Sequence, residues 1–178
     1  VHQGLVAEVK PYEYSSLEEI IRLGKNKTNP VIVMLDGIND PHNLGAIIRS
    51  SDVFGVTGII VKKVNQVSLN STVAKTSAGA IVNMPVAMVT NLTRTINELK
   101  KKNNWVYAME AGSKKLYKAD FTYPTALVIG SEGKGVSRLV MENVDEVLSL
   151  DMFGSVNSLN ASNAAAIGIY EVVRQRSR

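Results

Sequence analysis

The stretch from Val31 to Arg49 reads VIVMLDGINDPHNLGAIIR and carries the clearest indication of the fold. Its first part, Val31–Asp36, is the kind of apolar run that forms a strand buried on both faces of a sheet. Its last part has helical spacing, because Leu44, Ile47 and Ile48 fall on one stripe. A buried strand that turns directly into such a helix is typical of a parallel α/β sheet.

The same alternation of strand-like and helix-like segments continues along the chain. Strands are expected at residues 31–36, 58–62, 85–89, 105–110, 126–130 and 146–150. Helices are expected at residues 17–24, 43–54, 71–80, 92–102, 137–143 and 158–176. This pattern predicts an α/β domain with a mostly parallel sheet flanked by helices, and a ligand site at the carboxyl ends of the strands.

Length and composition restrict the class of protein. A chain of 178 residues with 45% hydrophobic and 20% charged residues suits one globular domain. The chain has 0 Cys, which excludes disulfides, thiolate metal sites and a cysteine nucleophile. His2 and His42 are far apart, so no metal site is expected, and no apolar run is long enough to cross a membrane. A cytoplasmic protein is therefore expected.

Two features concern the surroundings of the domain. Residues 1–16 are polar and irregular and are expected to be a connector, with the domain itself at residues 17–178. The net charge is +4, and it concentrates in the window 94–118, whose basic residues outnumber Glu98 and Glu110. Such a window suits a polyanion, or else it is a solvated lysine-rich surface. Its basic residues are Arg94, Lys100, Lys101, Lys102, Lys114, Lys115 and Lys118.

The turn within the opening stretch carries two candidate functional side chains. Asn43 stands where the N-cap of the helix is expected. Arg49 follows Gly45 by one helical turn, so its guanidinium could fold back toward the start of the helix. The alternative is an ordinary capped helix with a surface arginine.

A second turn follows the buried run 126–130 and reads GSEGKGV from Gly130. Glycines at a strand end let backbone N–H groups approach a ligand closely. A phosphate-binding P-loop does not fit, because Lys134 is followed by Gly135 rather than by a hydroxyl residue. Glu132 would also repel a phosphate. The alternative is that the glycines only make tight turns.

A third turn reads GSVNSLNASNAAA over residues 154–166. It holds more Ser and Asn than one N-cap requires, so its amides could bind a polar ligand, although a well-capped core helix is the alternative. The residues behind it form a narrow stripe that permits close approach of another helix, such as one from a second subunit. The stripe consists of Ala161, Ala164, Ala165, Gly168 and Val172.

Taken together and in this order, the three turns resemble the three motifs of the SpoU (TrmH) family of RNA ribose 2′-O-methyltransferases. Asn43 with Arg49 matches the first motif, the residues from Gly130 to Gly135 match the second, and Ser158-Leu159-Asn160 matches the third. The resemblance covers residues 31–176. One departure is Asp151, where the family usually has proline.

The start of the chain carries a further resemblance. Residues 2–7 are similar to the stretch that follows a small N-terminal RNA-binding domain in the family's large-subunit rRNA guanosine methyltransferases. This implies that residues 1–16 connect to such a domain, which is absent from the sequence given.

The resemblance implies a SPOUT-type fold, with a C-terminal trefoil knot, that works as a homodimer and binds S-adenosylmethionine. Carried over by position, the cofactor-binding residues would be Thr76, Ser77, Ala78, Gly79, Gly130, Leu150, Met152, Ser158 and Leu159. The implied reaction is methylation of a ribose 2′-hydroxyl in RNA, and the expected substrate is a guanosine of large-subunit ribosomal RNA.

The implied catalytic residues are Arg49, Asn43, Glu132, Ser158 and Asn160. Because a guanidinium keeps its proton at ordinary pH, Arg49 is expected to clamp a phosphate and stabilise charge on the ribose oxygen. If a base is needed, Glu132 is the only acid in the three turns that is placed to accept the proton. Asn43 and Asn160 would orient the substrate or hold the loops, and Ser158 would bridge the cofactor and the knot.

Other functions stay open at this point. An RNA-binding module without catalysis would use the basic window and would not bind S-adenosylmethionine. A nucleotide phosphatase or NTPase is disfavoured by the broken P-loop spacing. Within the family, the alternatives are a tRNA guanosine methyltransferase and an antibiotic-resistance rRNA adenosine methyltransferase.

Overall fold

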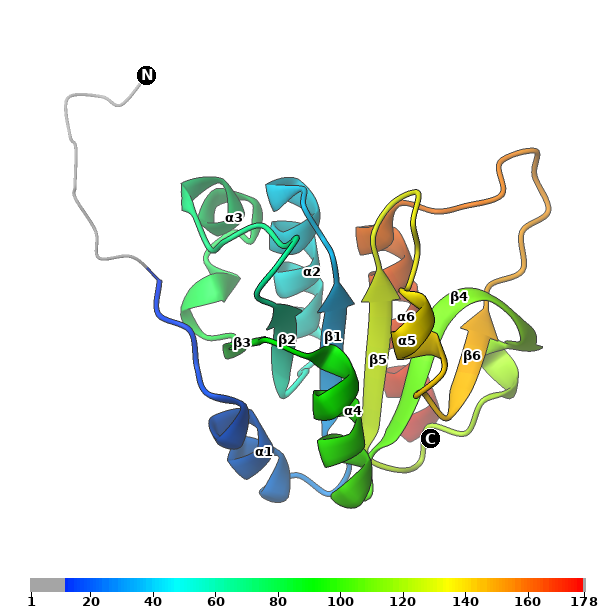
Figure 1. Ribbon diagram of the computed structural model, residues 1–178, viewed down its shortest axis with the longest axis horizontal. Coiled ribbons are helices and arrows are strands. Elements are labelled where there is room, and N and C mark those ends of the chain that lie inside the picture. Colours follow the sequence, from blue (N-terminus) through cyan, green and yellow to red (C-terminus); the bar gives the residue numbers. More distant parts are fainter. Residues whose placement is uncertain (1–11, 178) are drawn as a thin grey trace.

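The computed structural model describes residues 12–177, and a six-stranded sheet lies at its centre (Figure 1). The strand order is β3-β2-β1-β5-β4-β6, and every neighbouring pair is parallel. The strands are β1 (Val31–Asp36), β2 (Gly58–Lys62), β3 (Val86–Val89), β4 (Trp105–Lys115), β5 (Thr125–Gly130) and β6 (Glu146–Ser149). The predicted α/β class and parallel sheet are confirmed.

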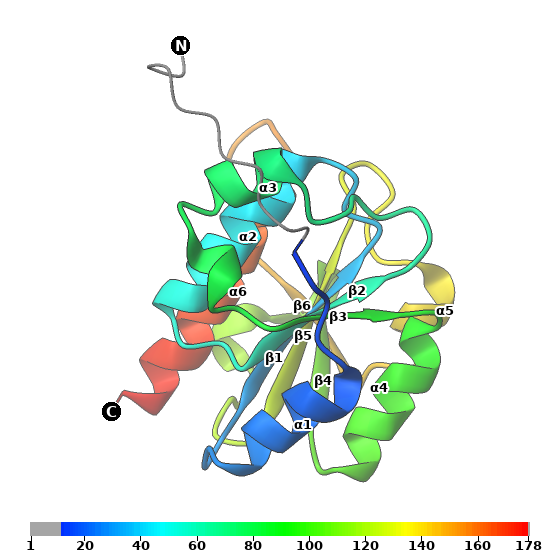
Figure 2. The same ribbon diagram turned by 90° about the vertical axis from the view of Figure 1, so that its left-hand side faces the viewer.

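Helices cover both faces of this sheet (Figures 1 and 2). The helices α2 (Pro41–Val53), α3 (Ser71–Thr76) and α6 (Ala161–Arg176) lie on one face. The other face carries α1 (Leu17–Lys25), α4 (Leu92–Lys101) and α5 (Arg138–Met141). Two short 3₁₀ helices, η1 (Ala80–Val82) and η2 (Leu116–Lys118), complete the structure. The domain is therefore a three-layer sandwich.

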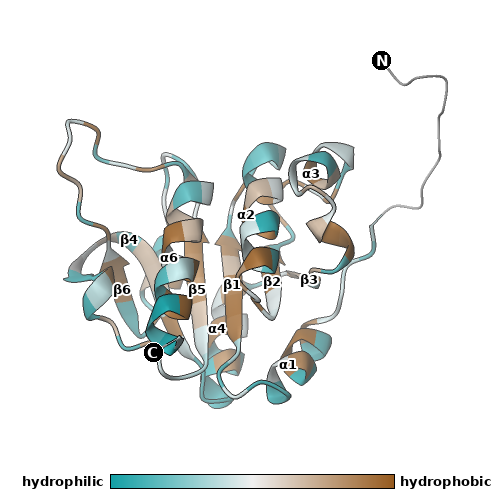
Figure 3. Cartoon of the chain, turned by 180° about the vertical axis from the view of Figure 1, so that it is seen from behind, coloured by the Kyte–Doolittle hydropathy of each residue, from teal (hydrophilic) through white to brown (hydrophobic). Residues whose placement is uncertain are grey.

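The central strands β1 and β5 are buried along their whole length. Alternate residues of β1 serve the two cores, so Val33 packs toward α2 and α6 while Met34 packs toward α1 and α4. Figure 3 shows hydrophobic residues concentrated in these two strands. A strand covered on both faces has no polar side, which explains the apolar run that opened the sequence.

The start of α2 differs from the prediction. Asp40, not Asn43, is the N-cap, and its Oδ1 accepts a hydrogen bond from the His42 N–H at 2.9 Å. Pro41 takes the first helical position, where its missing N–H costs nothing. Asn43 therefore lies inside the first turn, and its amide is available for tertiary contacts.

Other element boundaries also differ from the prediction. The predicted helix 71–80 ends at Thr76, because Ala78 and Gly79 take positive φ values of 51° and 86° before η1 begins. Strand β4 runs on to Lys115, past a bulge between Met109 and Lys114. Helix α6 begins at Ala161 rather than at residue 158.

Part of the predicted connector belongs to the folded domain. The Ser15 N–H donates to the Val86 carbonyl at 2.8 Å, and the Tyr14 hydroxyl accepts from the Leu69 N–H at 3.1 Å. The hydroxyl of Ser16 caps α1. Residues 1–11 of the predicted connector lie outside the described residues. The predicted trefoil knot stays a prediction, because strand order alone does not define how a chain threads.

The end of α6 is fixed by the guanidinium of Arg176. Its Nε donates to the Phe121 carbonyl at 2.7 Å, its Nη1 to the Asn29 carbonyl at 2.6 Å and its Nη2 to the Tyr123 carbonyl at 2.6 Å. The same Nη2 also donates to the Thr125 hydroxyl at 3.0 Å. Burial lowers the pKa of Arg176. This one side chain therefore ties the last helix to the two segments that precede β1 and β5.

Replacing Arg176 with methionine is expected to lower the free energy of unfolding by about 2–4 kcal/mol, because partly buried carbonyls lose charge-assisted bonds. Urea unfolding measures this change. The control is Arg138→Met, since the Arg138 side chain is 85% exposed and pairs with Glu142 at the surface. That control is expected to cost less than about 0.5 kcal/mol. Equal losses in the two variants would contradict the anchoring role.

Candidate active site

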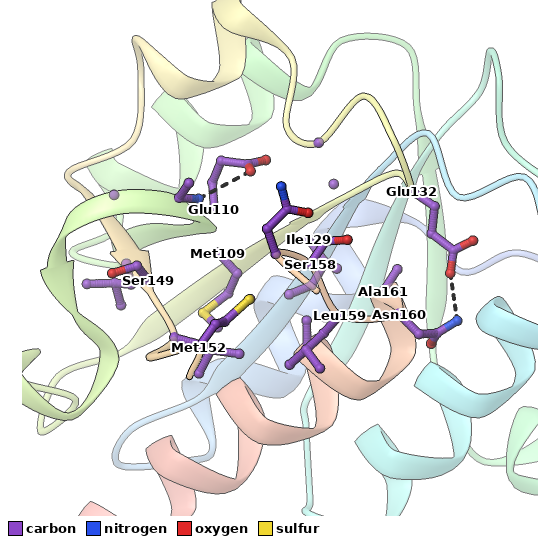
Figure 4. Close-up of a pocket in the computed structure, with 18 of the residues that line it drawn as sticks. Met109, Glu110, Ile129, Glu132, Ser149, Met152, Ser158, Leu159, Asn160 and Ala161 are labelled. Carbon is purple, nitrogen blue, oxygen red and sulfur yellow. Dashed lines mark hydrogen bonds between the residues drawn. The ribbon is translucent and has the colours of Figure 1, made fainter. Parts of the chain in front are cut away.

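A cleft of about 1160 Å³ opens at the carboxyl ends of β5, β4 and β6, beside the start of α6 (Figure 4). This is the edge of the sheet where the alternation of strands and helices predicted a ligand site. The turn after β5 contributes Gly130, Ser131, Glu132, Gly133 and Gly135. The end of β4 contributes Met109, Glu110, Ala111, Gly112 and Lys115. The remaining lining consists of Ile129, Leu148, Ser149, Leu150, Met152, Asn157, Ser158, Leu159, Asn160, Ala161 and Ala164.

The turn after β5 is closed by its own backbone. The Ser131 N–H donates to the Gly135 carbonyl at 3.2 Å, and the Gly135 N–H donates back at 2.9 Å. Gly133 and Gly135 take positive φ values of 80° and 63°. A Cβ atom at Gly130 would overlap the backbone of Gly135 and Val136. A larger residue at Gly130 would therefore not fit, and Gly133 and Gly135 supply the positive φ values of the turn.

The N–H groups of this turn point mostly to protein acceptors rather than to a ligand. The Val136 N–H donates to Glu110 Oε2 at 2.9 Å, and the Ser137 N–H donates to Asp36 Oδ2 at 2.8 Å. With the Ser131 and Gly135 groups also used, the turn is not an anion cradle of the P-loop kind. These four N–H groups therefore donate within the chain, and the approach of a ligand to the other amides of the turn stays a prediction.

Asn43, Glu132 and Asn160, one from each of the three predicted turns, form a single hydrogen-bonded cluster. Asn160 Nδ2 donates to Glu132 Oε1 at 2.6 Å and to Asn43 Oδ1 at 2.9 Å. Asn43 Nδ2 donates to the same Glu132 oxygen at 3.2 Å. Asn43 is buried, so its amide is held between these two partners. The structure thus brings three of the predicted catalytic residues together.

Asn160 also caps α6. Its Oδ1 accepts from the Ser162 N–H at 2.9 Å and from the Asn163 N–H at 3.4 Å, which fixes its amide nitrogen toward Glu132. Figure 4 shows the bond between Glu132 and Asn160 at one end of the cleft, with Met109 and Met152 toward the other. The cap therefore orients the cluster, and these two N–H groups are not free for a ligand.

The predicted cofactor-binding residues divide into two groups. Gly130, Leu150, Met152, Ser158 and Leu159 all line the cleft. The residues from Thr76 to Gly79 do not line it. They lie at the end of α3, where the Ser77 hydroxyl donates to the Ala74 carbonyl at 2.9 Å and Thr76 packs against α2.

Arg49 is exposed and is not among the residues that line the cleft. Gly45, expected to make room for its side chain, instead faces α3, where an added Cβ would lie 2.6 Å from Thr76 Cβ. The cleft of a single chain therefore contains Ser158, Glu132 and Asn160 without Arg49.

An exposed apolar face joins α2 and α6. Val53 on α2 is 70% exposed, and Tyr170 on α6 is 53% exposed beside Ile167. The rings of Phe54 and Tyr170 lie 5.8 Å apart and connect the two helices. Arg49 precedes Val53 by one helical turn, so it lies on the same side of α2. Exposed apolar faces of this kind mark protein–protein contacts.

The small-residue stripe of α6 serves the chain's own core. Ala161, Ala165, Gly168 and Val172 are buried, and a Cβ at Gly168 would lie 3.3 Å from Met109 Sδ. The expected close approach of another helix is made within the chain, by α2, and not by a second subunit at these buried residues. The strands β5 and β4 also pack against α6.

The basic window is not one free surface. Lys100 pairs with Asp145 at 2.8 Å and Lys114 pairs with Glu146 at 2.7 Å. Lys115 pairs with Asp151 at 2.8 Å. Each of these acids lies outside the window in sequence, which is why the local charge sum overstated the free positive charge.

Sequence reasoning missed the contribution of β4 to the cleft. Glu110 is the most informative of these residues, because its carboxylate accepts from the Ala111 and Val136 N–H groups and supports the turn after β5. The strand was expected to end at Glu110, and the sequence offers no signal that it neighbours β5 and β6. Only the strand order reveals this contribution.

Neither a membrane-spanning helix nor a metal-binding group is found among residues 12–177. No helix in this part of the chain combines the length and the apolar character needed to cross a bilayer. In the same residues, no three His, Asp or Glu side chains are grouped so as to hold a metal ion.

Comparisons with known proteins agree with this geometry. The model of the SpoU rRNA Methylase family matches residues 30–170. YacO of Bacillus subtilis (strain 168), whose name places it in the TrmH family of tRNA/rRNA methyltransferases, is 47% identical over 178 residues. The match covers 99% of this chain and 72% of YacO.

Two solved structures share the fold. The SpoU methyltransferase AviRb of Streptomyces viridochromogenes, in complex with the cofactor AdoMet, matches with a TM-score of 0.80 at 30% identity over 85% of this chain. A TrmH/SpoU tRNA modifying enzyme of A. aeolicus matches with a TM-score of 0.77 at 28% identity over 90% of this chain. The chain spans 59% of the AviRb chain and 83% of the A. aeolicus chain.

Proposed function

The chain belongs to the SpoU rRNA methylase family, and from this we propose that it transfers a methyl group from S-adenosylmethionine to a ribose 2′-hydroxyl in RNA. The observation that carries the proposal is the cluster of Asn43, Glu132 and Asn160, which lies beside a cleft of suitable size. Pockets for ligands of this size usually measure about 300–1,000 Å³.

The residues of the cleft fit this cofactor better than they fit a nucleoside triphosphate. Leu150, Met152 and Leu159 offer apolar contacts, and Glu110 and Glu132 place carboxylates in the cleft. Negative side chains favour a cationic sulfonium and oppose a triphosphate. When bound, S-adenosylmethionine supplies an electrophilic methyl group. AviRb, which matches this fold, was solved with that cofactor.

The chain's own residues would then position the hydroxyl and take its proton. Glu132 Oε1 is occupied by the two amides, whereas Oε2 makes no hydrogen bond within residues 12–177, so Oε2 is the atom proposed to accept the proton. Asn43 and Asn160 hold the carboxylate in place. Ser158, on the cleft wall, is proposed to contact the cofactor.

Arg49 is proposed to act from a second copy of the chain. It lies on the same side of α2 as the exposed apolar face of Val53, Ile167 and Tyr170, and it does not line the cleft of its own chain. A symmetric homodimer through that face would bring Arg49 close to the partner. There its guanidinium would bind a phosphate of the substrate and stabilise the developing oxyanion.

The substrate is proposed to be a guanosine of large-subunit ribosomal RNA, in line with the rRNA family model. A tRNA is the second candidate, because the A. aeolicus tRNA modifying enzyme matches 90% of this chain. Incubation with methyl-labelled S-adenosylmethionine and separated rRNA and tRNA, followed by digestion to nucleosides, distinguishes them. Label in 2′-O-methylguanosine from 23S rRNA is expected. Label only in methylated bases, or none in any RNA, would contradict the proposal.

A further inference from the structure

The segment that follows β6 forms one wall of the cleft with very little support. Residues 151–160 are all exposed, and the segment up to α6 holds no helix or strand. Figure 1 shows it as an orange loop that extends away from the sheet. Leu150, Met152, Ser158 and Leu159 nevertheless all line the cleft. A wall of this kind must be held in place if it is to bind a ligand.

Asn160 holds the end of this segment through its bonds to Asn43 and Glu132, and one further contact holds its start. Lys115 Nζ lies 2.8 Å from Asp151 Oδ1, at the point where the segment leaves β6. Within the described part of the chain, no other ion pair or hydrogen bond involves residues 151–159. Lys115 itself lines the cleft, at the end of the extended strand β4. The pair therefore connects two walls of the cleft.

We propose that the Lys115–Asp151 ion pair holds the wall of residues 150–159 over the cleft and thereby sets the affinity for S-adenosylmethionine. This inference rests on the proposed function, since it concerns the same cofactor. Lys115 and Asp151 are positioning residues, because they act through Leu150 and Met152. Both side chains are about a third exposed, so salt screens their attraction and the cofactor affinity becomes dependent on ionic strength.

The test measures the dissociation constant of S-adenosylmethionine by calorimetry for the unaltered chain, for three variants of the ion pair and for one control variant. Lys115→Met and Asp151→Asn each remove the ion pair, and the double variant Lys115→Asp with Asp151→Lys reverses it. Lys114→Met is the matched control, because it breaks the neighbouring Lys114–Glu146 pair, whose lysine does not line the cleft. All are compared at low salt and at about 1 M salt, where the screening length falls to about 3 Å.

Each single variant is expected to bind about 2- to 5-fold more weakly than the unaltered chain at low salt, and about equally at high salt. The reversed pair is expected to regain most of the lost affinity, and Lys114→Met to lose none.

Single variants that bind as tightly as the unaltered chain would overturn the inference. So would a reversed pair that binds no better than Lys115→Met, since that outcome means direct contact between Lys115 and the cofactor. An unaltered chain that binds no S-adenosylmethionine would instead overturn the proposed function.

Discussion

If Arg49 acts as proposed, replacing it with alanine is expected to lower the rate of methyl transfer by about 10²–10³-fold, because the developing charge on the ribose oxygen would lose its cationic donor. The affinity for S-adenosylmethionine is expected to change by less than about 2-fold, since Arg49 does not line the cleft. Single-turnover methylation and calorimetry measure the two quantities separately. Arg49→Lys is expected to lose most of the activity as well, because an ammonium cannot bind phosphate in a bidentate manner.

Mixing two inactive variants tests whether Arg49 acts across a dimer. If it does, a heterodimer of Arg49→Ala with Asn160→Ala contains one intact site, in which the second chain supplies Arg49. Random mixing would then restore about one quarter of the activity, because half of the dimers are mixed and each has one intact site of two. No recovery in the mixture, with both variants folded and dimeric, would place Arg49 in the site of its own chain. Full activity of Arg49→Lys would contradict the bidentate clamp.

Replacing Gly130 with alanine is expected to abolish binding of S-adenosylmethionine and to lower the free energy of unfolding by at least about 2 kcal/mol. The added Cβ would overlap the backbone of Gly135 and Val136, and backbone cannot move aside as a flexible side chain can. Because Glu132 lies within this turn, the shift would also break its bonds to Asn43 and Asn160. Thermal unfolding and calorimetry measure both effects.

Gly154→Ala is the control for Gly130→Ala. Gly154 lies in the exposed segment before α6, and a Cβ there would meet no atom within 4 Å. Its replacement is expected to change stability by less than about 0.5 kcal/mol. If Gly130→Ala behaved like this control, the turn after β5 would be more adaptable than its backbone contacts indicate, and its role in the site would be wrong.

The layers of the fold were predictable because their strands and helices can be recognised from the hydrophobic pattern of neighbouring residues. The runs at Val31–Asp36 and 126–130 are apolar throughout, as strands buried on both faces must be. The cap of α2 was misassigned because Asp40 and Asn43 are both good N-cap residues, and Pro41 at the first helical position decided between them. The end of α3 was missed because Ala78 takes a positive φ that its residue type disfavours.

The site was predictable only where the sequence carries a motif. Asn43, Glu132 and Asn160 stand in the three motif-like turns, and the structure joins them. Glu110 and Lys115 carry no such signal, because their approach to the cleft depends on β4 lying between β5 and β6. The pairing of Lys115 with Asp151 depends on the same strand order. Contacts made between distant segments cannot be read from spacing along the chain.

A crystal structure of the protein grown with S-adenosylmethionine, or with its demethylated product, would locate the cofactor relative to the cleft at the ends of β5, β4 and β6. Electron density for the ligand is expected in this cleft, in contact with Gly130, Leu150, Met152, Ser158 and Leu159. Density only beside Thr76–Gly79, or a protein that crystallises without the ligand at saturating concentration, would contradict it.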